Sequence, residues 1–172
     1  MEMSWFFKTA RGHAEVYGRR TDQTIVEMAG AGVHGVLFTT TRRRHLKIFV
    51  DAAPFERELE CYQRLEAAGV GEVHGHAIPG LMGHDADLLL LDLSTVARPF
   101  VLDFAGVELD TPLEERWPAA TLAGQMKRWE SNFSADQWPT VLRIWRELGE
   151  THGIWSTDLH LGNFGFPPDD AR

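Results

Sequence analysis

The chain has 172 residues, of which 44% are hydrophobic and 24% charged, so it is large and apolar enough for one domain or two small lobes and is unlike a disordered protein. Its net charge of −8 disfavours a broad nucleic-acid-binding surface or an anionic-membrane surface. The single cysteine, Cys61, excludes an internal disulfide, and no apolar run is long enough for a signal peptide or a membrane span, so we expect a cytoplasmic protein without membrane contact.

The first fifty residues predict a short helix or arm followed by strands. Aromatic residues among charges indicate the helix or arm over residues 1–20, and strand-like patterns follow over residues 24–30, 35–41 and 45–50. The segment Gly30-Ala-Gly32-Val-His-Gly35 separates the first two strands and has the spacing G-x-G-x-x-G. A dinucleotide-binding fingerprint would open a helix, whereas β-rich sequence follows here, so we predict a strand–loop–strand flap. A simple glycine-rich hairpin turn is the alternative.

Lys47 and Glu58 are the first candidate pair of functional residues. Lys47 lies in the middle of the third predicted strand, where a lysine is costly unless its ammonium meets an anion. The next helix is predicted over residues 54–68, and Glu58, Tyr62 and Leu65 share one side of it by their i, i+4, i+7 spacing. We therefore expect the lysine and the glutamate to face each other. The alternatives are an edge-strand lysine that limits aggregation and a solvated glutamate beside neighbouring arginines.

The middle of the chain predicts two more antiparallel strands. They cover residues 73–82 and 88–93 with a turn between them, and the four leucines from Leu88 to Leu91 indicate a strand buried on both faces. Strand-like sequence continues over residues 98–110. The lobe boundary is predicted near Ser94.

The last third of the chain predicts helices. Thr111-Pro-Leu-Glu114 has the pattern of a capping box, and Pro118 interrupts the helical pattern that follows. The strongest helical periodicity runs from Trp138 to Leu148. Beyond this helix, the polar segment from Asp158 to Asn163 is followed by alternating apolar residues, which predict a short strand. The expected fold class is α+β.

The spacing between Asp158 and Asn163 suits a loop in which a carboxylate orients a hydroxyl and an amide oxygen binds a divalent metal. A polar turn before a strand is the alternative. The segment Asp158-Leu-His-Leu-Gly-Asn163 resembles the catalytic loop of the protein-kinase-like superfamily, and it is most similar to the aminoglycoside, choline and lipopolysaccharide-core kinases. The glycine segment, Lys47, Glu58, the leucine strand and the long helix precede it in the order typical of that superfamily.

This resemblance implies a two-lobed protein-kinase-like fold and an ATP-dependent phosphotransferase. Residues 1–93 would form an N-lobe with an antiparallel sheet and one helix, and residues 94–172 would form a short helical C-lobe. The resemblance implies that ATP contacts Gly30, Gly32, Gly35, Lys47, Asp92 and Ser94, that Glu58 holds Lys47, that Asp158 is the catalytic base, and that Asn163 binds Mg²⁺. The acceptor would be a hydroxyl of a small molecule or a protein, which the sequence does not identify.

Three departures from the superfamily pattern make a pseudokinase the alternative. Ser156-Thr157 replace the histidine-containing pair that usually precedes the catalytic aspartate, and His45 replaces a small residue above the adenine. The family has a second metal-binding aspartate on the strand beyond the asparagine, whereas this sequence ends soon after Asp169 and Asp170. We therefore expect a truncated chain or an incomplete site, with weak ATP binding that depends little on Mg²⁺ and with poor phosphotransfer.

Two further groups of residues could bind a metal. Asp103-Phe-Ala-Gly106 has the composition of the metal-binding Asp-Phe-Gly of kinases, but it precedes the Asp158 loop, so the sequence does not support that role for Asp103. A metal-binding module formed by His74, His76, His84 and Asp85 is a third functional class. Their spacing matches no zinc site.

Overall fold

The computed structural model describes residues 3–167, which form two compact units. Unit 1 contains the residues up to Gln63 together with Pro79–Thr95, and unit 2 contains Arg64–Ile78 together with the residues from Val96 onward. Both units combine helices with mainly antiparallel strands, so the protein is α+β, as predicted. The sequence prediction assigns all of residues 1–93 to one lobe, whereas the structure groups residues 64–78 with unit 2.

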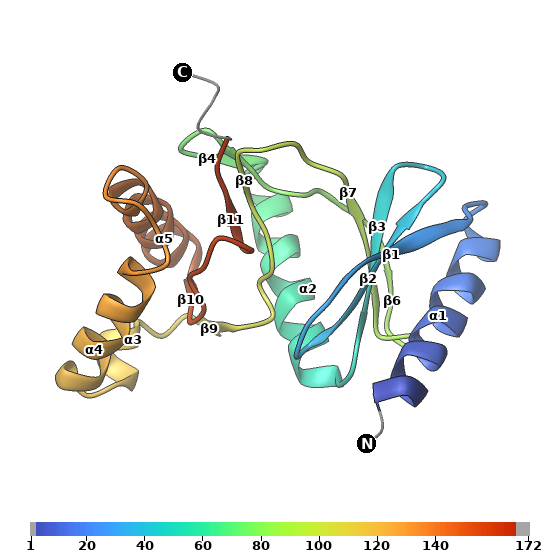
Figure 1. The fold of residues 1–172 in the computed structure, drawn as a ribbon, viewed down its shortest axis with the longest axis horizontal. Helices are drawn as coiled ribbons and strands as arrows, with labels where there is room; N and C mark the ends of the chain where they lie inside the picture. The colour runs from blue at the N-terminus through green and yellow to red at the C-terminus, as the bar shows by residue number, and fades with distance from the viewer. Residues whose placement is uncertain (1–2, 168–172) are drawn as a thin grey trace. The chain divides into compact units, whose positions relative to one another are not determined.

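Unit 1 is built on a five-stranded antiparallel sheet with the strand order β1-β2-β3-β7-β6 (Figure 1). Its strands are β1 Ile25–Ala31, β2 Gly35–Thr40, β3 Arg44–Phe49, β6 Leu81–Asp85 and β7 Leu90–Ser94. Its helices are α1 Met3–Arg20 and α2 Ala52–Ala67, whose last turn belongs to unit 2. The predicted antiparallel sheet and the helix after the lysine strand are confirmed.

The two helices cover opposite faces of this sheet (Figure 1). Ala10 and Ala14 of α1 are fully buried against a core that includes Phe38 and Leu46. Side chains alternate along a strand, so Lys47 points to the other face, which α2 covers. The prediction of a single helix on the sheet is therefore wrong, because the small side chains of α1 allow an 18-residue helix to pack closely on the first face.

A buried carboxylate joins α1 to the sheet. Asp92 of β7 is completely buried, and its Oδ2 accepts hydrogen bonds from Gln23 Nε2 at 2.9 Å, Arg44 at 3.1 Å and the Tyr17 hydroxyl at 3.5 Å. Gln23 in turn accepts a hydrogen bond from the Thr40 hydroxyl. This network crosses the end of α1, β2, β3 and β7, so it fixes the helix on the first face of the sheet.

The strand predicted over residues 73–82 is wrong. The structure divides this region into β4 Glu72–Val73, β5 His76–Ala77 and β6. His74 and Gly75 have φ angles of 49° and 78°, which turn the chain between β4 and β5 and are incompatible with a continuous strand. The next strand, β7, begins at Leu90, since Leu89 has a φ of 48°, and residues 90–93 are buried on both faces as predicted.

Unit 2 contains two small sheets and three helices. The order of the four-stranded sheet is β11-β8-β5-β4, and β9 pairs with β10 in the other sheet. The remaining strands are β8 Phe100–Val101, β9 Val107–Leu109, β10 Ile154–Ser156 and β11 Phe164–Gly165, and the helices are α3 Leu113–Arg116, α4 Ala119–Glu130 and α5 Trp138–His152. The long helix before the Asp158 loop is confirmed, but the capping box is wrong, because α3 begins after Pro112 without a side-chain cap. No helix in residues 3–167 is both long and apolar enough to span a bilayer.

The apolar face of α5 packs against β10 with little free space. The rings of Trp145 and Trp155 meet edge to face, with 5.0 Å between their centroids. Gly149 lies directly against the Trp155 ring, so that a Cβ at this position would overlap the ring. The helix ends at Gly153, which has a φ of 68° and therefore closes α5 in the left-handed conformation.

We predict that Gly149→Ala lowers the free energy of unfolding by roughly 1–3 kcal/mol, because the added methyl group overpacks the contact with Trp155. Gly124→Ala in α4 is the matched control, since its Cβ would meet open space, and it should raise stability by about 0.5–1 kcal/mol. Urea denaturation of both variants measures the difference. Equal stability of the two variants would contradict the close packing at Gly149.

The hydroxyl of Tyr17 should lose its proton at an unusually high pH. Burial, reinforced by the negative charge of Asp92, raises the pKa of Tyr17 to about 12, above its value of about 10 in an unfolded chain. Between these two values the unfolded state loses the proton first, so the free energy of unfolding contributed by Tyr17 falls as the pH rises through this range. Urea denaturation across this range should show a smaller loss for Tyr17→Phe than for the unmodified chain, and parallel losses would contradict the network.

Candidate functional site

Unit 1 brings Lys47 and Glu58 together, as the sequence predicts. Lys47 Nζ lies 2.6 Å from Glu58 Oε2, and the two side chains are only 12% and 1% exposed. Phe55, one turn before Glu58 on α2, meets Phe49 of β3 edge to face at 5.8 Å, which sets the helix against the strand. A charged pair with so little solvent access is held in one geometry, so Lys47 presents a fixed cation on this face of the sheet.

The glycine segment forms the tip of the β1–β2 hairpin, and no helix follows it, as predicted. The Gly32 N–H donates to the Gly35 carbonyl at 2.9 Å. A Cβ on Gly35 would overlap the carbonyl oxygen of Ile48, so this glycine allows β2 to pair closely with β3. Gly30 and Gly32 border open space, which leaves their backbone accessible. Both the flap and the simple hairpin turn agree with this geometry, and a role in ATP binding stays a prediction.

The structure does not bring the Asp92 side chain to the Lys47 face. Asp92 pairs with Leu46 in the sheet and points toward α1, where its network of hydrogen bonds occupies it. The Ser94 hydroxyl accepts a hydrogen bond from the Gly80 N–H at 2.8 Å. Any contact of Asp92 with an adenine on the Lys47 face would therefore use its main chain, because side chains alternate along β7.

His45 shares the Lys47 face of the sheet. It pairs with Leu93, and its Nδ1 lies 3.4 Å from the Thr95 hydroxyl. Burial lowers the pKa of His45, so its ring is neutral at pH 7. This face thus offers one fixed cation, a neutral ring and the apolar side chains of β7.

Unit 2 places Asp158 and Asn163 at the two ends of one loop between β10 and β11. The Asn163 amide donates to the Asp158 carbonyl at 3.0 Å, and Asn163 is buried whereas the Asp158 side chain is 65% exposed. Both the N–H and the hydroxyl of Thr157 donate to the Gly106 carbonyl at 2.9 Å, and the Asp158 N–H donates to the Ser156 hydroxyl at 3.3 Å. Ser156 and Thr157 therefore support the loop backbone where the superfamily has a histidine-containing pair.

The same loop contains a residue that the sequence analysis did not single out. His160 Nδ1 accepts a hydrogen bond from the Gly162 N–H at 2.9 Å, and Nε2 lies 3.3 Å from Asp158 Oδ2. The sequence signal that could have identified it is a histidine two residues after Asp158. Its contact depends on a turn of the loop that the sequence alone did not predict.

Strand pairing brings a distant segment beside this loop. β8 pairs with β11, β9 pairs with β10, and the Leu102 N–H donates to the Asn163 carbonyl at 2.8 Å. Residues 102–106, which connect β8 to β9, therefore lie against residues 157–163, which connect β10 to β11. The position of Asp103 ahead of the Asp158 loop in sequence argues against a metal-binding role, and the antiparallel pairing removes that objection.

Asp103 has a backbone conformation that is uncommon for a residue with a side chain. Its φ is 64°, and its Oδ1 accepts a hydrogen bond from the Ala105 N–H at 3.1 Å. An aspartate tolerates the left-handed region because it can make this local hydrogen bond. The turn presents a carboxylate beside the loop that carries Asn163.

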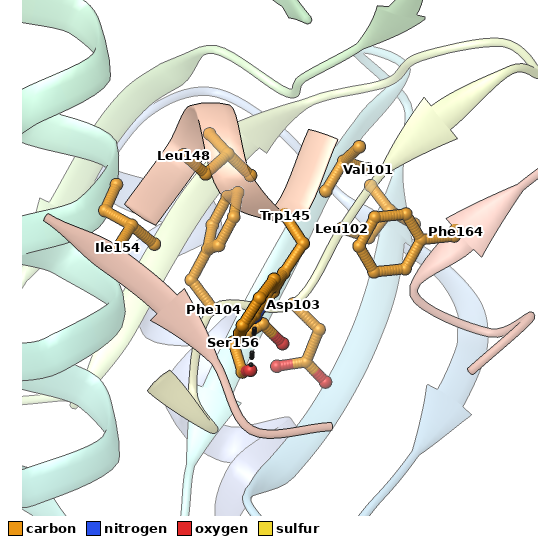
Figure 2. Close-up of a pocket in the computed structure, with 9 residues that line it drawn as sticks. All are labelled: Val101, Leu102, Asp103, Phe104, Trp145, Leu148, Ile154, Ser156 and Phe164. Carbon is orange, nitrogen blue, oxygen red and sulfur yellow. Dashed lines mark hydrogen bonds between the residues drawn. The ribbon is translucent and has the colours of Figure 1, made fainter. Parts of the chain in front are cut away.

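Asp103 and Ser156 supply the polar part of a small cavity in unit 2 (Figure 2). Its volume is about 10 Å³, and the indole of Trp145 donates to the Ser156 carbonyl at 3.0 Å along its wall. The other lining residues are Val101, Leu102, Phe104, Leu148, Ile154 and Phe164. A ligand such as a nucleotide needs some hundreds of Å³, so this cavity is part of the loop's packing and not its ligand site.

The described residues offer few carboxylates and imidazoles for a metal. Within residues 3–167, no three side chains of His, Cys, Asp or Glu converge into a metal site, and Asp85 of the histidine-rich alternative pairs with Arg20 at 2.7 Å. Asp169 and Asp170 lie outside the described residues. Asp103 and Asn163 carry a carboxylate and an amide oxygen, and Mg²⁺ usually takes one or two protein oxygen ligands and completes its shell with phosphates and water.

We predict that Glu58→Ala lowers the free energy of unfolding by about 3–5 kcal/mol, because it leaves the ammonium of Lys47 in a poorly hydrated place. Arg11→Ala, which breaks an exposed pair with Glu15 on α1, should cost less than about 1 kcal/mol. Chemical denaturation measures both values. An unchanged midpoint for Glu58→Ala would mean that the glutamate is solvated.

Comparison with known proteins gives no relative from which the chemistry of this site could be inferred. No protein-family model, no curated protein and no solved structure matches this chain.

Proposed function

We propose that the chain binds Mg²⁺–ATP and transfers the γ-phosphoryl group to a hydroxyl, and that its two units correspond to the two lobes of a protein-kinase-like fold. One observation carries the proposal. Residues 102–106 and 157–163 lie side by side in unit 2, which sets an aspartate, Asp103, beside the loop that holds Asp158 and Asn163. These three side chains are the types that phosphoryl transfer requires for metal binding and for orienting the attacking hydroxyl.

Unit 1 would contribute the binding of the phosphates. The Lys47 ammonium, held at 2.6 Å by Glu58, is a positioned cation for phosphate oxygens. Gly30 and Gly32 border open space at the tip of a hairpin, where no Cβ blocks the approach of a phosphate. The α2 helix keeps the lysine in place before the ligand arrives, which lowers the entropy lost on binding.

Unit 2 would contribute the metal ligands and the base. Asn163 and Asp103 would hold Mg²⁺, which neutralises charge on the phosphates. The exposed Asp158 carboxylate would orient the acceptor hydroxyl and take its proton. The acceptor oxygen then forms the new bond to the γ-phosphorus, and the bond from that phosphorus to the bridging oxygen breaks to release ADP.

The assignment of Asp103 differs from the expectation of an incomplete metal site. That expectation assumed that the metal-binding aspartate must follow Asn163 along the chain. In this protein β8 comes before the loop in sequence but lies beside β11 in the sheet. The Asp103 carboxylate would therefore come from a segment that precedes Asn163 in sequence. The proposed site therefore has both metal ligands within the described residues.

A nucleotide-binding protein without phosphotransfer is the second candidate. The specific observation in its favour is His45, whose neutral ring occupies the Lys47 face beside Leu93 and reduces the room for an adenine. Both candidates predict ATP binding, and they differ in turnover and in the effect of Asp158.

We predict that Mg²⁺ raises the affinity for ATP by at least about tenfold and that Asp103→Asn abolishes this gain while it preserves the fold. Asparagine tolerates the φ of 64° and can still accept from the Ala105 N–H, so the variant removes the charge and can keep this turn. Isothermal titration with ATP, with and without Mg²⁺, measures the effect. Asp22→Asn is the matched control, because Asp22 also has a positive φ, of 53°, and its partner is an exposed arginine of unit 1.

Turnover is measured as ADP formation with a panel of small-molecule alcohols and hydroxyl-bearing peptides. Turnover that Asp158→Asn reduces by about a hundredfold or more supports phosphotransfer. ATP binding without turnover supports the second candidate. Absence of ATP binding both with and without Mg²⁺ would reject both.

A further inference from the structure

The hydrogen bonds of the Asp158 loop define the tautomer of His160. Nδ1 of its ring lies 2.9 Å from the Gly162 nitrogen, and a backbone N–H can only donate. Nδ1 is therefore the acceptor and carries no proton. The ring proton lies on Nε2, the atom that lies 3.3 Å from Asp158 Oδ2.

The ring of His160 is held in place by the backbone of its own loop. The His160 carbonyl accepts from the N–H groups of Asn163 and Phe164, at 2.9 and 3.0 Å, which closes a turn around the ring. A Cβ on Gly162 would lie 2.6 Å from the ring Cε1 and 2.8 Å from Nδ1, so glycine is needed for the close approach. The donor is thus oriented before any ligand binds.

The Asp158 carboxylate lies within reach of this donor. Its side chain is 65% exposed, and its Oδ2 lies 3.3 Å from His160 Nε2. An exposed carboxylate without a fixed donor samples several rotamers, and a base must stay within reach of the proton that it accepts.

We propose that His160 is a positioning residue that holds the Asp158 carboxylate toward the acceptor hydroxyl, an inference that rests on the proposed phosphotransfer. The neutral ring donates one hydrogen bond and adds no charge, so it acts on Asp158 and not on the phosphates. Removing the donor lowers the fraction of time in which the carboxylate is aligned and leaves ATP binding intact. The effect therefore falls on kcat and not on the KM for ATP.

The first test detects the hydrogen bond itself. In the full chain with ¹⁵N-labelled histidine, two-bond ¹H–¹⁵N spectra distinguish a protonated Nε2 from a protonated Nδ1, and loss of one signal set in His160→Gln assigns the ring. We expect His160 to have a protonated Nε2 whose shift changes in Asp158→Ala. A protonated Nδ1, an average of both tautomers, or a signal that ignores Asp158→Ala would overturn the proposal.

The second test measures ADP formation with the acceptor found in the panel. His160→Phe keeps a planar ring without a donor and should lower kcat about tenfold, with the KM for ATP within about twofold. His160→Gln retains an N–H donor and should recover most of that loss. His84→Phe, at an exposed histidine of β6 in unit 1, is the matched control and should leave both constants unchanged.

The outcomes separate the two proposals. Equal losses in the Phe and Gln variants, or no loss in either, would reject the positioning role while phosphotransfer stands. Absence of turnover in the unmodified chain would reject the phosphotransfer and with it a catalytic role for His160. In that case the spectra still report whether the hydrogen bond to Asp158 exists.

Discussion

The antiparallel pairing of β8 with β11 and of β9 with β10 is the constraint on which the candidate site of unit 2 depends. Each pair is only two or three residues long, so neither would be stable as an isolated ribbon. The aromatic packing of α5 on β10 supplies the missing stability. The two connections that follow β8 and β10 are held against each other by these pairs, which sets Asp103 beside the loop of Asn163 and Asp158.

Unit 1 shows how alternation along a strand directs two buried charges to opposite faces of one sheet. Asp92 and Lys47 lie on neighbouring strands, yet they point to opposite faces of the sheet. Asp92 anchors α1 through Tyr17, and Gln23 and Arg44 bind the same carboxylate, whereas Lys47 meets Glu58 of α2. Each buried charge has a partner on its own face, so α1 can be fixed without using the lysine that the proposed chemistry requires.

Local patterns in the sequence predicted much of this structure, whereas the pairing of segments far apart along the chain could not be predicted from them. The strands around Lys47, the inward Glu58 and the long helix α5 follow from spacings of two and of three to four residues along the chain. The break at His74 was missed, because a histidine with a positive φ has no strong sequence signal. The position of Asp103 could not be found at all, since a sheet can place two segments side by side whatever their order in sequence. The functional roles of these residues stay predictions.

The order of these segments also bears on how the protein acquires its shape. The Leu102–Asn163 hydrogen bond joins residues whose separation in sequence includes α3, α4 and α5. Closing so long a loop costs entropy before the contact can repay it, so local helices form first and such pairings form late. A chain still emerging from the ribosome would contain Asp103 long before residues 157–163 are synthesised. The metal ligands of the proposed site would therefore remain apart until synthesis has passed Asn163, so the proposed site could not form in a shorter nascent chain.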